Sequence, residues 1–112
     1  YQCKDVFGIM EKDSGTSVKS LQVDGGATAN KLLMQFQSDI LETKVMLPKC
    51  LETTALGCAY LTGLNSGFFK DINEIKAIHS YQTIYLPLMQ KEDVTNKYNG
   101  WKKAVKATRA FK

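Results

Sequence analysis

Apolar residues recur along this chain with two spacings, one typical of helices and the other of strands. Spacing near 3.6 residues predicts five helices, over residues 1–13, 28–41, 53–64, 71–77 and 99–112. Alternation predicts strands over residues 18–23, 44–47 and, more loosely, 78–86. The order strand, helix, strand favours an α/β layer architecture with a largely parallel sheet segment.

The faces of these helices can be assigned from the same spacing. In the clearest helix, the face expected to be buried consists of Ala29, Leu32, Leu33, Phe36 and Ile40. The opposite face, expected in solvent, consists of Lys31, Gln35, Ser38 and Asp39. The helix over 53–64 is rich in small residues such as Gly57 and Cys58, which predicts a buried helix that packs closely on its neighbours. The inner face of the last helix is expected to consist of Trp101, Ala104, Val105, Thr108 and Phe111.

The chain has 112 residues, enough for a single modest domain. Two clear strands are too few for a complete sheet, and the sequence opens in the middle of a predicted helix without an initiator Met. We therefore expect residues 1–112 to be one portion of a longer protein. No apolar run approaches the roughly 18 residues of a membrane span, so no such span is expected.

Charge and cysteine content narrow the classes of function. The net charge is +4, and positions 97–112 contain six basic residues and no acidic one. That stretch could bind nucleic acid, but a solvated outer helix face is favoured, because the aromatic residues are not interleaved with the lysines.

Cys3, Cys50 and Cys58 form no CxxC pair and His79 is the single histidine, so no metal site is expected. Reduced, packing cysteines in a cytoplasmic protein are favoured over a Cys–His catalytic pair.

A glycine turn, Asp24-Gly25-Gly26-Ala27, lies between the first strand and the clearest helix. Glycine lets the backbone approach a nucleotide, and a helix N-terminus presents unpaired N–H groups to an anion. The turn is neither a P-loop, which needs GxxxxGK, nor the full GxGxxG fingerprint. A tight connection that binds nothing remains the alternative.

Two polar residues flank this turn. Asn30 lies one helical turn beyond Gly26, and its amide could donate to and accept from a purine edge, or could simply cap the helix. Asp24 could act as a base or metal ligand, but a carboxylate that organises the turn is favoured.

Four stretches together resemble one known family: residues 23–30 (VDGGATAN), 33–41 (LMQFQSDIL), 54–61 (TALGCAYL) and 100–105 (GWKKAV). They resemble the C-terminal region of the FGGY family of carbohydrate kinases, and within it the glycerol kinases. The resemblance implies an actin-like, ribonuclease-H-type ATPase domain, the C-terminal domain of a two-domain kinase. It also implies transfer of phosphate from ATP to glycerol, giving glycerol 3-phosphate.

The resemblance assigns roles to individual positions. It implies that Gly26 contacts an ATP phosphate through its backbone, that Asn30 contacts the adenine, and that Gly25 and Ala27 shape the turn. The catalytic residues, the glycerol site and the Mg²⁺ ligands are expected outside this chain, which is expected to be inactive alone. We further expect a cytoplasmic homo-oligomer. A sister kinase with another polyol or ketose acceptor, or a non-catalytic actin-like nucleotide-binding domain, remains open.

Overall fold

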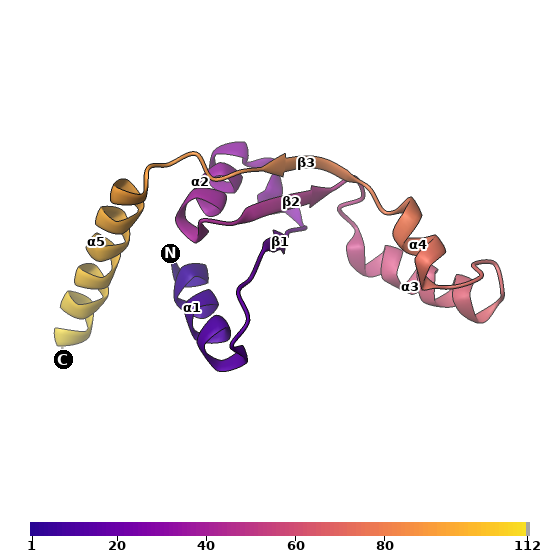
Figure 1. Cartoon of the computed structure of the whole chain (residues 1–112), viewed down its shortest axis with the longest axis horizontal. Helices are drawn as coiled ribbons and strands as arrows, with labels where there is room; N and C mark the ends of the chain where they lie inside the picture. Colours follow the sequence, from indigo (N-terminus) through magenta and orange to yellow (C-terminus); the bar gives the residue numbers. More distant parts are fainter. Residues whose placement is uncertain (112) are drawn as a thin grey trace.

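The computed structural model describes residues 1–111, in which helices alternate with short strands (Figure 1). In chain order the elements are α1 (Gln2–Ser14), β1 (Ser20–Gln22), the 3₁₀ helix η1 (Gly26–Ala29), α2 (Lys31–Leu41), β2 (Lys44–Pro48), α3 (Thr53–Asn65), α4 (Ile72–Ile78), β3 (Tyr81–Tyr85) and α5 (Lys91–Ala110). Each predicted element is present. β1 and β3 are shorter than predicted, and α5 is longer at its start; Lys112 of the predicted last helix lies outside the described residues.

The three strands form one sheet in the order β1-β2-β3. β1 and β2 are parallel, with Leu21 opposite Val45, and η1 and α2 connect them. β2 and β3 are antiparallel, with Met46 opposite Ile84. The expected parallel arrangement is therefore confirmed for the first pair, and the third strand adds an antiparallel pair. α3 and α4 lie together beyond one end of the sheet, so the chain leaves and re-enters at that end and β3 runs back along β2 (Figure 1).

The core lies between α2 and the sheet. Met34 and Ile40 of α2 are buried, as are Val45 and Leu47 of β2. Each side chain fully removed from water stabilises the fold by about 1.5–3 kcal/mol. This packing holds α2, and the turn that precedes it, against the sheet.

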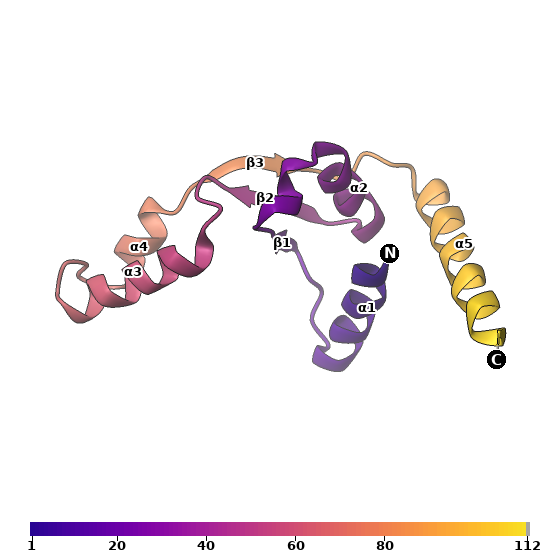
Figure 2. The ribbon, with the colours of Figure 1, turned by 180° about the vertical axis from the view of Figure 1, so that it is seen from behind.

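The chain is extended, and many of its apolar faces are uncovered. Its radius of gyration is 17.9 Å, whereas about 13 Å is typical of a compact domain of this length. α5 lies at one end and the α3–α4 pair at the other, with α1 and the N-terminus on the α5 side (Figure 2). Apolar residues of the helices are therefore largely exposed, including Ile9 in α1, Leu61 in α3 and Phe111 after α5. The expectation that α3 is buried is wrong for the described residues, apart from Gly63.

Two further expectations are corrected by the observed burial. In α2, Ser38 and Asp39 are buried, because their side chains hydrogen-bond β3 and the connection that follows it. Leu32, predicted to be buried, is exposed. Cys3, Cys50 and Cys58 are free and exposed rather than packed. No helix of residues 1–111 combines the length and apolar character needed to cross a bilayer.

Candidate functional site

The glycine turn begins at the carboxyl end of β1. The Val23 N–H donates to the Met46 carbonyl at 3.2 Å, which extends the ladder between β1 and β2 by one bond before the chain turns away. In open α/β sheets, ligands bind beyond the carboxyl ends of parallel strands. The turn therefore lies at the edge of the sheet where a ligand is expected.

Gly25 gives the turn its shape. Its φ of 81° and ψ of 175° are available to glycine and strained for other residues. Its carbonyl accepts from both the N–H and the hydroxyl of Thr28, at 3.1 and 2.6 Å, and Thr28 is buried. The Ala27 carbonyl accepts from the Asn30 N–H at 3.2 Å. These bonds define the path of the backbone through η1.

Gly26 differs from Gly25, because nothing in the described chain requires a glycine there. Its φ lies outside the left-handed region, and a Cβ at this position would meet no atom within 4 Å. Gly26 is exposed and is the first residue of η1, where backbone N–H groups have no partner within the helix. The open space over this backbone suits a ligand that approaches the main chain closely.

Asn30 is the N-cap of α2. The Leu33 N–H donates to Asn30 Oδ1 at 3.0 Å, so the capping interpretation is correct. α2 begins at Lys31 rather than at residue 28 or 29, because residues 26–29 form a 3₁₀ turn instead. Capping occupies the amide oxygen but leaves Asn30 Nδ2 without a partner among the described residues, on an exposed side chain. A purine would therefore meet a donor here.

Asp24 organises the junction of the turn with α3. The Thr53 hydroxyl donates to Asp24 Oδ2, joining the first residue of α3 to the turn. The favoured structural role for this carboxylate is therefore consistent with its partner. Sequence reasoning missed Thr53; the signal was that Asp24 and Thr53 follow neighbouring parallel strands, whose carboxyl ends lie at the same edge.

A hollow of about 210 Å³ adjoins the turn at this edge, and it is lined by Gln22, Val23, Asp24, Pro48, Thr53 and His79. His79 Nε2 is buried and has no hydrogen-bond partner in the described chain, while its ring lies edge-on to Tyr81 at 5.0 Å. His79 and Cys50 also line a smaller hollow of about 130 Å³. No hydrogen bond joins these two side chains within residues 1–111.

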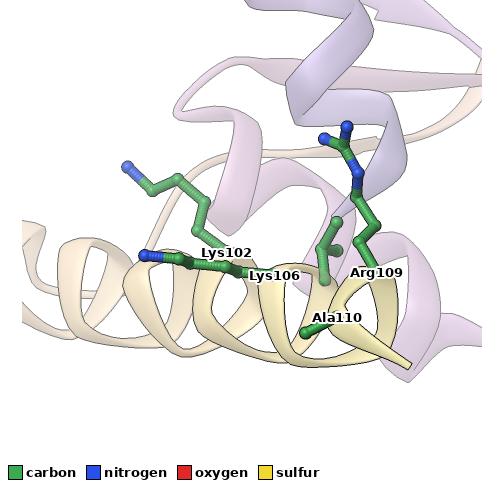
Figure 3. A pocket seen from close by; sticks show the side chains of 5 residues that line it. Lys102, Lys106, Arg109 and Ala110 are labelled. Carbon is green, nitrogen blue, oxygen red and sulfur yellow. The ribbon is translucent and has the colours of Figure 1, made fainter. Parts of the chain in front are cut away.

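The basic side chains of α5 line a different surface. Lys102, Lys106 and Arg109 follow one another along the helix and border a hollow of about 460 Å³ (Figure 3). Every residue lining it belongs to α5, and Figure 3 shows Arg109 directed away from the two lysines. Lys102 Nζ lies 4.7 Å from the centre of the Tyr98 ring. This arrangement favours a solvated helix flank over a convergent anion site.

Comparison with known proteins assigns the chain to a family. Residues 1–66 match the FGGY family of carbohydrate kinases, C-terminal domain. The chain belongs to this family, and its α/β fold is part of an actin-like ATPase domain.

Individual relatives are similar along the whole chain. The glycerol kinase of Enterococcus casseliflavus is 53% identical over 112 residues, which are 100% of this chain and 22% of that protein. The glycerol kinase of Alkaliphilus oremlandii is 55% identical over 105 residues, 94% of this chain and 21% of that protein. The chain thus spans about a fifth of the length of the curated relatives it matches.

Solved structures show the same relationship. The crystal structure of Plasmodium falciparum glycerol kinase with ADP superposes with a TM-score of 0.87 at 32% identity, covering 96% of this chain and 22% of that one. A ligand-bound xylulose kinase from Lactobacillus acidophilus superposes with a TM-score of 0.70 at 15% identity, covering 85% of this chain and 19% of that one. At that identity the second likeness concerns the fold alone.

Proposed function

We propose that this chain forms one wall of the nucleotide pocket in a kinase that transfers phosphate from ATP to glycerol, giving glycerol 3-phosphate and ADP. The observation that carries the proposal is the glycine turn, in which Gly26 leaves its backbone uncovered at the carboxyl edge of the sheet. The whole-chain similarity to glycerol kinases, one of them solved with ADP, supports the same substrates.

Each residue of the turn has a separate role in this proposal. The N–H of Gly26 donates to a phosphate oxygen, while Gly25 and Ala27 set the path of the backbone. Asn30 Nδ2 donates to a ring nitrogen of adenine, since Oδ1 is held by the helix cap. Phosphoryl transfer depends mainly on positioning and on stabilisation of charge, so a fixed nucleotide is a direct contribution to the reaction.

In this proposal, Mg²⁺ and glycerol are bound by residues outside this chain. Within residues 1–111 no group of three His, Cys, Asp or Glu side chains is placed to hold a metal. Mg²⁺ neutralises phosphate charge when bound, and we assign its ligands, the glycerol site and the catalytic residues to parts of the protein outside this chain. No catalytic residue is assigned here, and this portion alone is expected to be inactive.

We further propose that residues 1–112 form one continuous portion of the C-terminal domain. The exposed apolar residues of α1 and α3 support this, because they offer surface for the rest of that domain to cover. A cytoplasmic homo-oligomer remains our prediction; the free thiols suit a compartment that keeps cysteines reduced.

ADP release by the intact protein tests the proposal, with ATP present and glycerol, a pentulose or no acceptor added. Release that depends on glycerol is the expected result. Release with the pentulose alone would retain the nucleotide site and replace the substrate, as in a sister kinase. Nucleotide binding without acceptor-dependent release would overturn the kinase proposal in favour of a non-catalytic actin-like domain.

A further inference from the structure

The carboxylate of Asp39 is buried near the end of α2, where its charge is unusual. Asp39 is 7% exposed and lies two residues before the end of the helix. A negative charge at a helix C-terminus is unfavourable, because the carbonyl groups there carry partial negative charge. The one ion pair among the described residues joins Lys4 to Glu42, so Asp39 has no cation of its own.

Three N–H groups compensate this charge, and two of them come from a distant part of the chain. Asp39 Oδ1 accepts from the backbone N–H of Leu88 at 2.6 Å and of Met89 at 3.2 Å. It also accepts from Gln35 Nε2 at 3.0 Å, and the same amide donates to the Leu86 carbonyl at 2.8 Å. Hydrogen bonds to an ionised acceptor are stronger than neutral ones. Asp39 and Gln35 therefore bind the whole connection between β3 and α5.

The position of the β3–α5 connection also explains why the Asp39 carboxylate is tolerated near the end of α2. Leu88 and Met89 immediately precede the N-cap of α5, Gln90, whose side chain makes no capping hydrogen bond. Negative charge is favourable near a helix N-terminus. The hydrogen bonds of the Asp39 carboxylate thus join the end of α2 to the residues that lead into α5.

The opposite end of α2 carries the proposed nucleotide contacts. Asn30 caps that end, and η1 with Gly26 directly precedes it. Asn30 and Asp39 are nine positions apart, about 14 Å along a helix. Because α2 is short and stiff, a tilt at the Asp39 end displaces Asn30 and the turn at the other.

We infer that Asp39 is a positioning residue for nucleotide binding: by bonding the β3–α5 connection it sets the orientation of α2, and through α2 the placement of Asn30 and Gly26. This inference rests on the proposed function. It predicts that loss of these hydrogen bonds weakens nucleotide binding, although Asp39 itself lies at the other end of the helix from the nucleotide.

The test compares Asp39→Ala and Asp39→Asn in the intact protein. Asp39→Ala removes the acceptor. We expect the KM for ATP to rise at least about threefold, since small displacements of binding groups have large effects. The kcat and the KM for glycerol should change less than about twofold. Asp39→Asn keeps Oδ1, which accepts all three bonds, so near wild-type KM values are expected. ADP affinity measured by calorimetry should follow the KM for ATP.

A matched variant separates positioning from general loss of stability. Asp71→Ala removes the N-cap of α4, where Asp71 accepts from Asn73 and Glu74, and should lower the melting temperature without changing the KM for ATP. An unchanged KM for ATP in Asp39→Ala, or an equal rise in Asp71→Ala at matched stability, would overturn the inference. So would an Asp39→Asn variant that behaves like Asp39→Ala. If the wild-type protein itself binds no nucleotide, the proposed function fails instead.

Discussion

Tyr98 and Asp5 are 93 positions apart, yet the Tyr98 hydroxyl donates to Asp5 Oδ1 at 2.5 Å. The indole N–H of Trp101 donates to the other carboxylate oxygen at 2.8 Å, and the Tyr1 ring stacks on Trp101 at 5.6 Å. These contacts join α1 to α5. The hydrogen bond from Tyr98, followed by that from Trp101, lowers the pKa of Asp5, and the Asp5 carboxylate raises the pKa of Tyr98.

The first prediction concerns acid stability. Since the pKa of Asp5 is lower in the folded state, the stabilisation is present above about pH 4, the ordinary pKa of an aspartate, and is lost as the pH falls through the lowered folded value. We expect the difference in unfolding free energy between wild type and Asp5→Asn to shrink over that range. Urea unfolding of the intact protein at several pH values measures it.

A second variant makes this prediction specific. Tyr98→Phe removes the donor with the largest effect, so the pKa of Asp5 should move back toward its ordinary value, as measured by NMR titration. Parallel pH profiles for wild type and Asp5→Asn would contradict the assignment.

The second prediction separates the two functions of Asn30. Asn30→Asp keeps the oxygen that accepts from Leu33 but replaces the NH₂ donor, so stability should be nearly unchanged while the KM for ATP rises. Asn30→Ala loses the cap as well. It should show the same rise in the KM for ATP and also be less stable by about 1 kcal/mol. The KM for glycerol should stay nearly constant in both variants. A change confined to glycerol would disprove the adenine contact.

The location of the turn and of most elements could be predicted from the sequence, because both depend on local information. Glycines at 25 and 26 between a strand and a helix define a turn, and the helix predicted over residues 71–77 is present as α4, with Asp71 as its N-cap. Buried and exposed positions were harder to predict. Ser38 and Asp39 looked like a solvent face because their partners, around residues 85–89, lie far away in sequence.

The same limit applies to the site. Asn30 was correctly placed beside the turn, but which atom of its amide stays available depends on the register of α2, which starts at Lys31. The contact of Thr53 with Asp24 depends on the pairing of β1 with β2, which no local pattern specifies. The helices α1, α3 and α5 were predicted correctly as helices, but their apolar residues are exposed in this chain. The spacing of apolar residues does not say which surface covers them.

The third prediction uses the contrast between the two glycines of the turn. Gly26→Val should leave the fold largely intact, since a Cβ there meets nothing, but should raise the KM for ATP strongly because the side chain enters the space over the backbone. Gly25→Ala should instead lower stability by about 1–3 kcal/mol, because of the positive φ. Melting temperatures and the KM for ATP of both variants distinguish these effects. If Gly26→Val bound ATP like the wild type, no nucleotide would approach this backbone.

The last prediction concerns α3, where two glycines of one helix have opposite surroundings. A Cβ on Gly63 would lie 2.5 Å from Phe69 Cδ2, whereas a Cβ on Gly57 would meet nothing within 4 Å. Gly63→Ala should therefore destabilise the intact protein by about 1–3 kcal/mol through overpacking. Gly57→Ala should stabilise it by up to about 1 kcal/mol through helix propensity.

The Phe69 ring is the origin of the expected clash, so it also provides the control. Phe69 packs edge-on against Tyr60 at 5.9 Å, and a smaller side chain at 69 would leave room for a methyl group at 63. The double variant Gly63→Ala/Phe69→Leu should lose less unfolding free energy than the sum of the losses in the two single variants, because the residues are in direct contact. Additive effects would show that Gly63 is needed for another reason. Destabilisation by Gly57→Ala would show that a further part of the protein packs closely on α3, as its small residues first suggested.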